Sequence, residues 1–150
     1  MNRTVDLIIR DKSDNIALMV EVKCKLGVTT KWATEWFEYF SVIRSKSEFF
    51  LMVFPDQIFL WKTEGTRNDS SEPDYSVDAE KIFESYFHRI GSSPERISGH
   101  GFELMVASWL IQVMYSDVED LSKEESWLVK SGLFDAICDG KLEHDVEVFV

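Results

Sequence analysis

The sequence is short of cysteine and histidine and has no long hydrophobic segment. Two cysteines, Cys24 and Cys138, are too few for a disulfide framework and lack metal-ligand spacing, and the three histidines are scattered. No apolar run approaches the roughly 18 residues that cross a bilayer. Asp6, five residues after Met1, interrupts any signal-peptide core. We therefore expect a reduced, cytoplasmic protein with no membrane partner.

Positive charge is also scarce, and the net charge of −11 is unevenly distributed. Residues 1–75 carry 10 Lys/Arg against 12 Asp/Glu, whereas residues 76–150 carry 6 against 15. Because DNA is densely anionic, the acidic second half should repel it, and a nucleic-acid surface should use the first half. The candidate nucleic-acid-binding residues are therefore Arg10, Lys12, Lys25 and Lys31.

The length and apolar content indicate a single globular domain. The chain has 150 residues, of which 45% are hydrophobic and 13% aromatic, enough to bury a sizeable core. Within residues 1–150 we expect a core of hairpin, helix and strand at 1–61. A polar loop at 62–76 follows, and then an acidic, mostly helical part at 77–150.

Hydrophobic periodicity and turn residues predict the order of the elements. The expected elements of the first half are strands at 5–9, 16–24, 49–54 and 58–61, with a helix capped by Thr29 or Thr30 after the second strand. Those of the second half are a helix at 77–90 stopped by Gly91, a helix at 99–116 capped by Ser98, a capping box at Ser122–Glu125, a helix through 133–138 and a final strand at 146–150. This order predicts an α+β or α/β fold with a mixed sheet.

Three charged residues stand in the otherwise apolar strands of the first hairpin. Glu21 and Lys23 are two apart and face the same way. A two- or four-residue loop places Asp6 directly opposite Glu21, whereas a five-residue loop turns Asp6 away. Two carboxylates that close repel each other unless a cation lies between them, and Mg²⁺ prefers such oxygens. A solvated strand face with a cross-strand Glu–Lys pair is the alternative explanation of the same spacing.

The run from Asp6 through Glu21-Val22-Lys23 and into a helix resembles the PD-(D/E)xK nuclease superfamily. It is especially similar to the nuclease domains that begin type I restriction subunits, and to small bacterial proteins of the restriction-endonuclease-like fold. The resemblance covers roughly residues 3–61. It implies that Asp6, Glu21 and the Val22 carbonyl hold Mg²⁺ or Mn²⁺, and that Lys23 acts on the attacking water.

Many members of this superfamily also carry a Gln-x-x-x-Tyr pattern in the following helix. Here the corresponding positions are Glu35 and Tyr39, which the resemblance implies are supports around the metal site. Relatives that cut both strands often form homodimers.

An aromatic stripe in the first helix has two interpretations. Trp32, Trp36, Phe37 and Phe40 have the spacing of a core-facing stripe, and the same residues could form a platform for nucleic-acid bases. At helical spacing the core explanation is the usual one.

Two functions fit these patterns. The first is a Mg²⁺-dependent nuclease that hydrolyses phosphodiester bonds, with DNA as the expected substrate, in defence or repair. The second is a catalytically inactive module of nuclease fold that binds a basic protein partner through its acidic second half. They differ in whether the acidic pair must bind a divalent metal.

Overall fold

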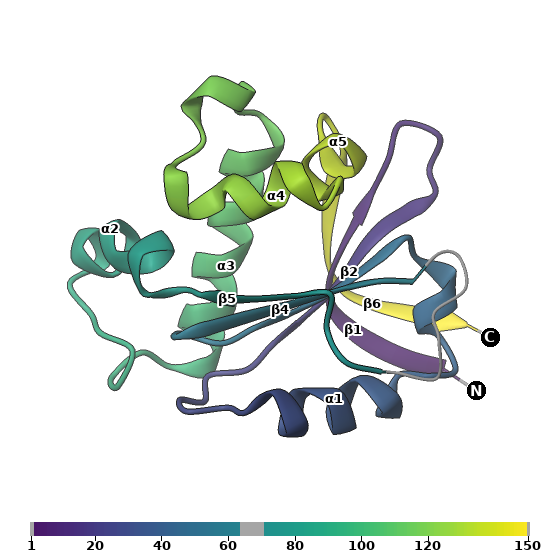
Figure 1. Ribbon diagram of the computed structural model, residues 1–150, viewed down its shortest axis with the longest axis horizontal. Helices are drawn as coiled ribbons and strands as arrows, with labels where there is room; N and C mark the ends of the chain where they lie inside the picture. The colour runs from purple at the N-terminus through teal and green to yellow at the C-terminus, as the bar shows by residue number, and fades with distance from the viewer. Residues whose placement is uncertain (1, 64–70, 150) are drawn as a thin grey trace.

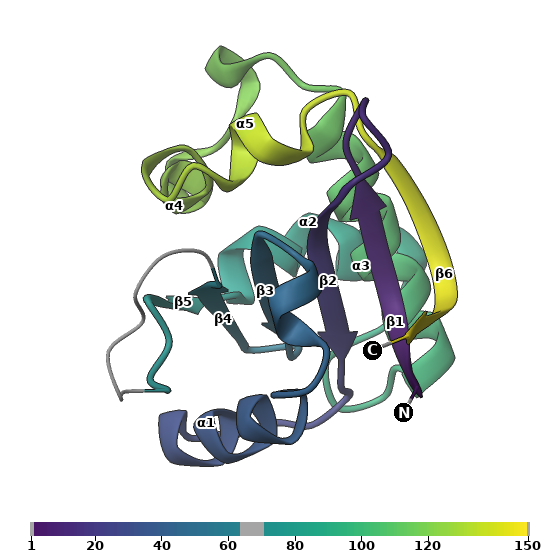
Figure 2. The ribbon, with the colours of Figure 1, turned by 90° about the vertical axis from the view of Figure 1, so that its right-hand side faces the viewer.

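A six-stranded mixed sheet separates helices on its two faces in the computed structural model, which describes residues 2–63 and 71–149 (Figure 1, Figure 2). The strands lie in the order β5-β4-β3-β2-β1-β6. Their bounds are β1 Asn2–Arg10, β2 Ile16–Val22, β3 Phe49–Val53, β4 Gln57–Lys62, β5 Tyr75–Asp78 and β6 Lys141–Phe149. The helices are α1 Thr30–Tyr39, α2 Glu80–Ile90, α3 Gly99–Met114, α4 Ser126–Lys130 and α5 Leu133–Ile137, with short 3₁₀ turns at Arg44–Lys46, Val118–Asp120 and Lys123–Glu125.

The sheet is mixed because one pair of neighbouring strands is parallel. β1 and β2 form the expected antiparallel hairpin, and the chain then crosses through α1 to β3, which runs parallel to β2. β3, β4 and β5 form an antiparallel meander. The last strand, β6, returns to the first and pairs with β1 along nearly its whole length. The expected α+β class with a mixed sheet is therefore confirmed.

The core has two layers, one on each face of the sheet. On one face α1 contributes Ala33 and Phe37, which pack on the sheet together with Phe50 and Trp61. On the other face α2, α3, α4 and α5 cover a larger layer (Figure 1). The central strands β2 and β3 are buried on both faces, which explains their continuous apolar runs.

The predicted capping residues at the beginnings and ends of the helices are confirmed. The Thr29 hydroxyl accepts a hydrogen bond from the Trp32 amide, and the Ser98 hydroxyl accepts one from the Gly101 amide. Gly91 ends α2 in the left-handed region at φ 65°, as a C-terminal glycine should. The predicted capping box at Ser122–Glu125 is present with both of its hydrogen bonds.

Two element boundaries are wrong in the prediction. The helix expected from Val77 begins only at Glu80, because residues Tyr75–Asp78 pair with β4 as a fifth strand. Tertiary strand pairing thus overrides the helical periodicity. The final strand begins at Lys141, five residues before the predicted start, because β1 provides a pairing partner.

The polar loop expected at 62–76 is only partly described. Residues 64–70 lie outside the described part of the chain. Lys62 ends β4, and Tyr75 and Ser76 belong to β5, so both ends of the predicted loop are strand residues. Among the described residues, no helix combines the length and apolarity of a membrane span.

Candidate metal and catalytic site

The register of the first hairpin places Asp6 opposite Glu21. Leu7 pairs with Val20 and Ile9 with Leu18, and continuing this register by one residue brings Asp6 to Glu21. The loop has five residues, since Arg10 pairs with Ile16. A loop of this length by itself would turn the Asp6 side chain away from Glu21. A β-bulge restores the alignment: opposite Ile9 and Arg10, β2 contains one extra residue, Ala17, between Ile16 and Leu18.

Asp6 marks a change of face within β1. Val5 and Ile8 pack in the layer under α1, whereas Leu7 and Ile9 pack in the opposite layer. Strict alternation would place Val5 with Leu7 and Ile9, so the strand changes face between Val5 and Leu7. The Asp6 carboxylate accepts a hydrogen bond from the Val22 amide at 2.8 Å, which fixes it beside the end of β2.

Glu21 is a buried carboxyl group, only 4% exposed. Burial, a hydrogen bond with Asp6 and the charge of Asp6 raise its pKa from 4.5 to about 10, although nearby Lys23 opposes the shift. Glu21 therefore carries a proton at neutral pH and donates it in the hydrogen bond to the Asp6 carboxylate. This is the way two adjacent carboxyl groups avoid mutual repulsion when no cation lies between them.

Lys23 continues the line of Glu21 beyond the end of β2. Its amide donates a hydrogen bond to the Val53 carbonyl at 3.0 Å, which keeps this segment attached to β3. Its ammonium nitrogen lies 4.8 Å from the centroid of the Trp36 ring on α1. The ring holds the cation by a cation–π contact, and the cation lies close enough to the Glu21 carboxyl group to lower its pKa.

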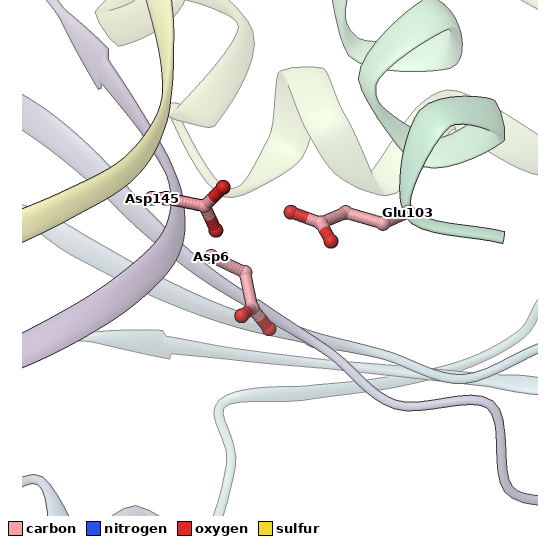
Figure 3. Close-up of side chains that lie close together, drawn as sticks. All are labelled: Asp6, Glu103 and Asp145. Carbon is pink, nitrogen blue, oxygen red and sulfur yellow. The ribbon is translucent and has the colours of Figure 1, made fainter. Parts of the chain in front are cut away.

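Two further carboxylates, Glu103 of α3 and Asp145 of β6, join Asp6. Ligand oxygens of the three residues lie within 4.8 Å of one another. Figure 3 shows Glu103 and Asp145 pointing toward each other, with Asp6 beside them. Burial and the charges of Asp6 and Asp145 raise the pKa of Glu103, whereas His144 and His100 oppose the shift. We call Asp6, Glu21, Glu103 and Asp145 the acidic site.

Asp145 reaches the acidic site through a distortion of β6. Val5 pairs with Val146 and Leu7 with His144, so Asp145 stands opposite Asp6. Asp145 has a φ of 49°, which aspartate tolerates better than most residues. Asp145 and Glu103 were not predicted from the sequence, because neither the β1–β6 pairing nor the packing of α3 leaves a local signal. Asp145 directly precedes the predicted final strand at 146–150, and Glu103 lies within the predicted helix at 99–116.

The other predicted site residues lie around this centre rather than in it. Glu35 is exposed on α1. Tyr39 is also exposed, and its hydroxyl accepts a hydrogen bond from the Arg3 guanidinium at 2.6 Å. Lys31 is exposed, and the Lys25 ammonium lies 5.2 Å from the centroid of the Trp32 ring.

Two of the predicted nucleic-acid-binding residues have acidic partners instead. The Arg10 guanidinium donates to the Glu143 carboxylate at 2.6 Å, and Lys12 lies 3.8 Å from Asp139. Both residues are at the loop end of the first hairpin. Their charge is partly compensated there, so Lys25 and Lys31 are the better phosphate-binding candidates of the four.

The donors of the acidic site suit a hard divalent cation. All four side chains offer carboxylate oxygens, which Mg²⁺ and Mn²⁺ prefer. The proton held between Glu21 and Asp6 occupies a place that a cation can take, since a metal favours the ionised form of both groups. The residues present therefore fit a Mg²⁺ ion. Asp6 would be a ligand whether the ion lay beside Glu21 or between Glu103 and Asp145.

Replacing Glu21 by glutamine should stabilise the metal-free protein, and most at alkaline pH. With a pKa of about 10 in the folded chain against 4.5 ordinarily, the folded chain holds one extra proton between those values. The free energy of unfolding of the parent therefore falls as pH rises through this window. Glutamine still donates to Asp6 but does not ionise. We expect a gain of several kcal/mol at pH 8 and less than about 1 kcal/mol near pH 5.

Urea unfolding in EDTA at pH 5 and pH 8 measures this gain. The exposed Glu124→Gln protein is the control, because it makes the same substitution at a solvated position away from the site. A difference that does not grow with pH would contradict the proton on Glu21.

Comparison of the chain with family models, with curated proteins and with solved structures finds no match. Function must therefore be argued from the chemistry of the site.

Proposed function

We propose that the protein is a Mg²⁺-dependent nuclease that hydrolyses phosphodiester bonds, with DNA as the expected substrate. The observation that carries the proposal is the hairpin register, which brings Asp6 opposite Glu21 and beside the Val22 amide. This is the placement that the resemblance to PD-(D/E)xK nucleases implies for the metal ligands. The alternative explanation, a solvated strand face, does not account for a Glu21 side chain that is buried and protonated.

Each residue of the acidic site has a role in this reaction. Mg²⁺, when bound, supplies Lewis-acid activation of the phosphate and of a water molecule. Asp6 and Glu21 would hold the ion through their carboxylate oxygens, for which Glu21 would have to be ionised. The Lys23 ammonium, steadied by Trp36, orients the attacking water or stabilises the charge that develops on the phosphate. Glu103 and Asp145, whose carboxylate oxygens lie within 4.8 Å of those of Asp6, could offer further oxygen ligands.

Cleavage of DNA in Mg²⁺ and in Mn²⁺ tests the proposal. Supercoiled, linear and branched DNA would be incubated with the parent and with an identically purified Lys23→Ala protein. We expect the variant to lose cleavage by about a hundredfold or more, since a charge-stabilising group is removed. Equal activity in the two proteins would point to a contaminant, and inactivity of both on every substrate would refute cleavage of these nucleic acids.

A second candidate function is a nuclease-fold module that binds a protein partner without catalysis. It is favoured by an exposed apolar row on the outer side of α3 and just beyond it, comprising Leu104, Ile111, Tyr115 and Val118. Leu104, Ile111 and Tyr115 follow helical spacing, and this row lies in the acidic part of the chain. Such a module should bind its partner equally well in Mg²⁺ and in EDTA, which distinguishes it from the nuclease.

A further inference from the structure

Three aromatic rings form a row along α1, and a cation lies over each of them. The rings of Trp32 and Trp36 are nearly parallel, with centroids 5.8 Å apart, and the rings of Trp36 and Tyr39 likewise, at 5.1 Å. A cation lies over each ring: Lys25 over Trp32 at 5.2 Å, Lys23 over Trp36 at 4.8 Å and Arg3 over Tyr39 at 4.0 Å. We call these six residues the cation–aromatic row.

The aromatic stripe of α1 is therefore divided between two environments. Phe37 and Phe40 are buried in the core, as the core interpretation of the stripe predicts. Trp32 and Trp36 are half-buried, and Tyr39 is 49% exposed. Of the predicted base platform, Phe37 and Phe40 are therefore internal, whereas Trp32 and Trp36 reach the surface. Tyr39, which was expected to support the metal site, lies beside them.

Two hydrogen-bond donors of the row lack an acceptor among the described residues. They are the Nε of Arg3 and the Nε1 of Trp36. An unpaired buried donor costs about 1–3 kcal/mol, so a ligand that brings acceptor oxygens would recover this energy after a small side-chain rotation. Both N–H groups would be paired by the same kind of ligand group, one rich in acceptor oxygens and preferably anionic.

We propose that the cation–aromatic row binds a single strand of nucleic acid and leads it to the acidic site. The proposal rests on the proposed nuclease function and names the form of its substrate. Arg3, Lys23 and Lys25 form a line of positive charge on a protein of net charge −11, and this line matches the phosphates of one strand. Lys23 belongs both to the row and to the surroundings of Glu21, so a bound strand passes the acidic site.

The aromatic partners favour a single strand over a duplex. Proteins that bind single strands combine a line of cations with rings on which unpaired bases stack. The exposed Tyr39 and the half-buried Trp32 and Trp36 offer such rings, whereas the bases of a duplex are stacked on each other and cannot reach them. The cation–π contacts hold the three cations in place before the strand arrives, which reduces the entropy lost on binding.

Fluorescence anisotropy of labelled oligonucleotides in EDTA tests the row without any cleavage. The probes are a 12-nucleotide oligo(dT) strand and a hairpin duplex of equal length. We expect the parent to bind the single strand more tightly, with a slope of log affinity against log salt of about −2 for three phosphate contacts. The Arg3→Ala/Lys25→Ala protein should bind the single strand about tenfold more weakly and with a shallower slope.

A charge-matched variant provides the control. Lys81→Ala/Lys130→Ala removes two exposed lysines from α2 and α4, on the opposite face of the sheet. It should bind the single strand within about twofold of the parent. Should the Arg3 variant fold poorly, Lys25→Glu at an exposed position gives the same test alone, with a loss of affinity expected.

The outcomes separate this proposal from the nuclease proposal. Single-strand binding that depends on Arg3 and Lys25, without cleavage in Mg²⁺, supports the row and refutes the nuclease. Cleavage together with equal binding by the two double variants supports the nuclease and overturns the row. Duplex binding as tight as single-strand binding, or absence of binding by the parent, also overturns the row.

Discussion

Replacing Asp6 by asparagine is expected to abolish tight binding of divalent metal and to lower cleavage by about a thousandfold or more. Among the four described residues of the acidic site, Asp6 links Glu21 to the pair Glu103 and Asp145. It is hydrogen-bonded with Glu21 on one side and lies within 4.8 Å of Glu103 and Asp145 on the other. Asparagine preserves an acceptor for the Val22 amide, so the hairpin should keep its structure.

Isothermal titration with Mg²⁺ and with Mn²⁺ measures the binding directly. The parent should release a proton as the metal binds, because Glu21 must ionise, and the measured heat should therefore change with the buffer. Asp120→Asn, an exposed substitution of the same kind, should leave both binding and cleavage unchanged. Metal binding by Asp6→Asn with the affinity of the parent would contradict a metal site at Asp6.

Two further variants locate the ion within the acidic site. If the ion lies between Asp6 and Glu21, as the nuclease resemblance implies, Glu21→Gln should weaken binding strongly and Glu103→Gln should weaken it little. If the ion lies in the cluster of Asp6, Glu103 and Asp145, the order should be reversed. Because Glu21→Gln is also expected to stabilise the protein, loss of metal binding in that variant cannot be ascribed to unfolding.

Replacing Gly140 by alanine is expected to lower the free energy of unfolding by about 2–4 kcal/mol. A Cβ at this buried position would lie 2.6 Å from the Arg10 carbonyl oxygen, 2.9 Å from the Ile9 side chain and 3.0 Å from the Ile137 carbonyl oxygen. Two of these three neighbours are backbone atoms that cannot move without disturbing β1 or α5. Gly140 stands where α5 ends and β6 begins, so its close approach fixes the strand that carries Asp145.

Urea unfolding followed by tryptophan fluorescence measures this effect. Gly99→Ala is the matched control, because a Cβ there meets no atom within 4 Å and Gly99 begins α3. The control should stay within about 0.5 kcal/mol of the parent. A Gly140→Ala protein as stable as the Gly99→Ala protein would show that β6 can shift away from β1 at low cost.

Local chemistry was enough to predict most of the helices and the first hairpin. Threonine, serine and glycine caps act on backbone groups a few residues away, so Thr29, Ser98 and Gly91 could be recognised from the sequence. The fifth strand could not, because Tyr75–Asp78 become a strand only through pairing with β4.

The acidic site divides in the same way. The sequence by itself determined that Glu21 and Lys23 share a face and that Asp6 was a candidate partner, since side chains alternate along a strand. Only the tertiary structure decided that Asp6 lies opposite Glu21, because the bulge between Ile9 and Arg10 offsets a five-residue loop. It also brought Glu103 and Asp145 to Asp6 from distant parts of the chain. Long-range packing and pairing place these groups, and neither has a signature in the residues that are neighbours along the sequence.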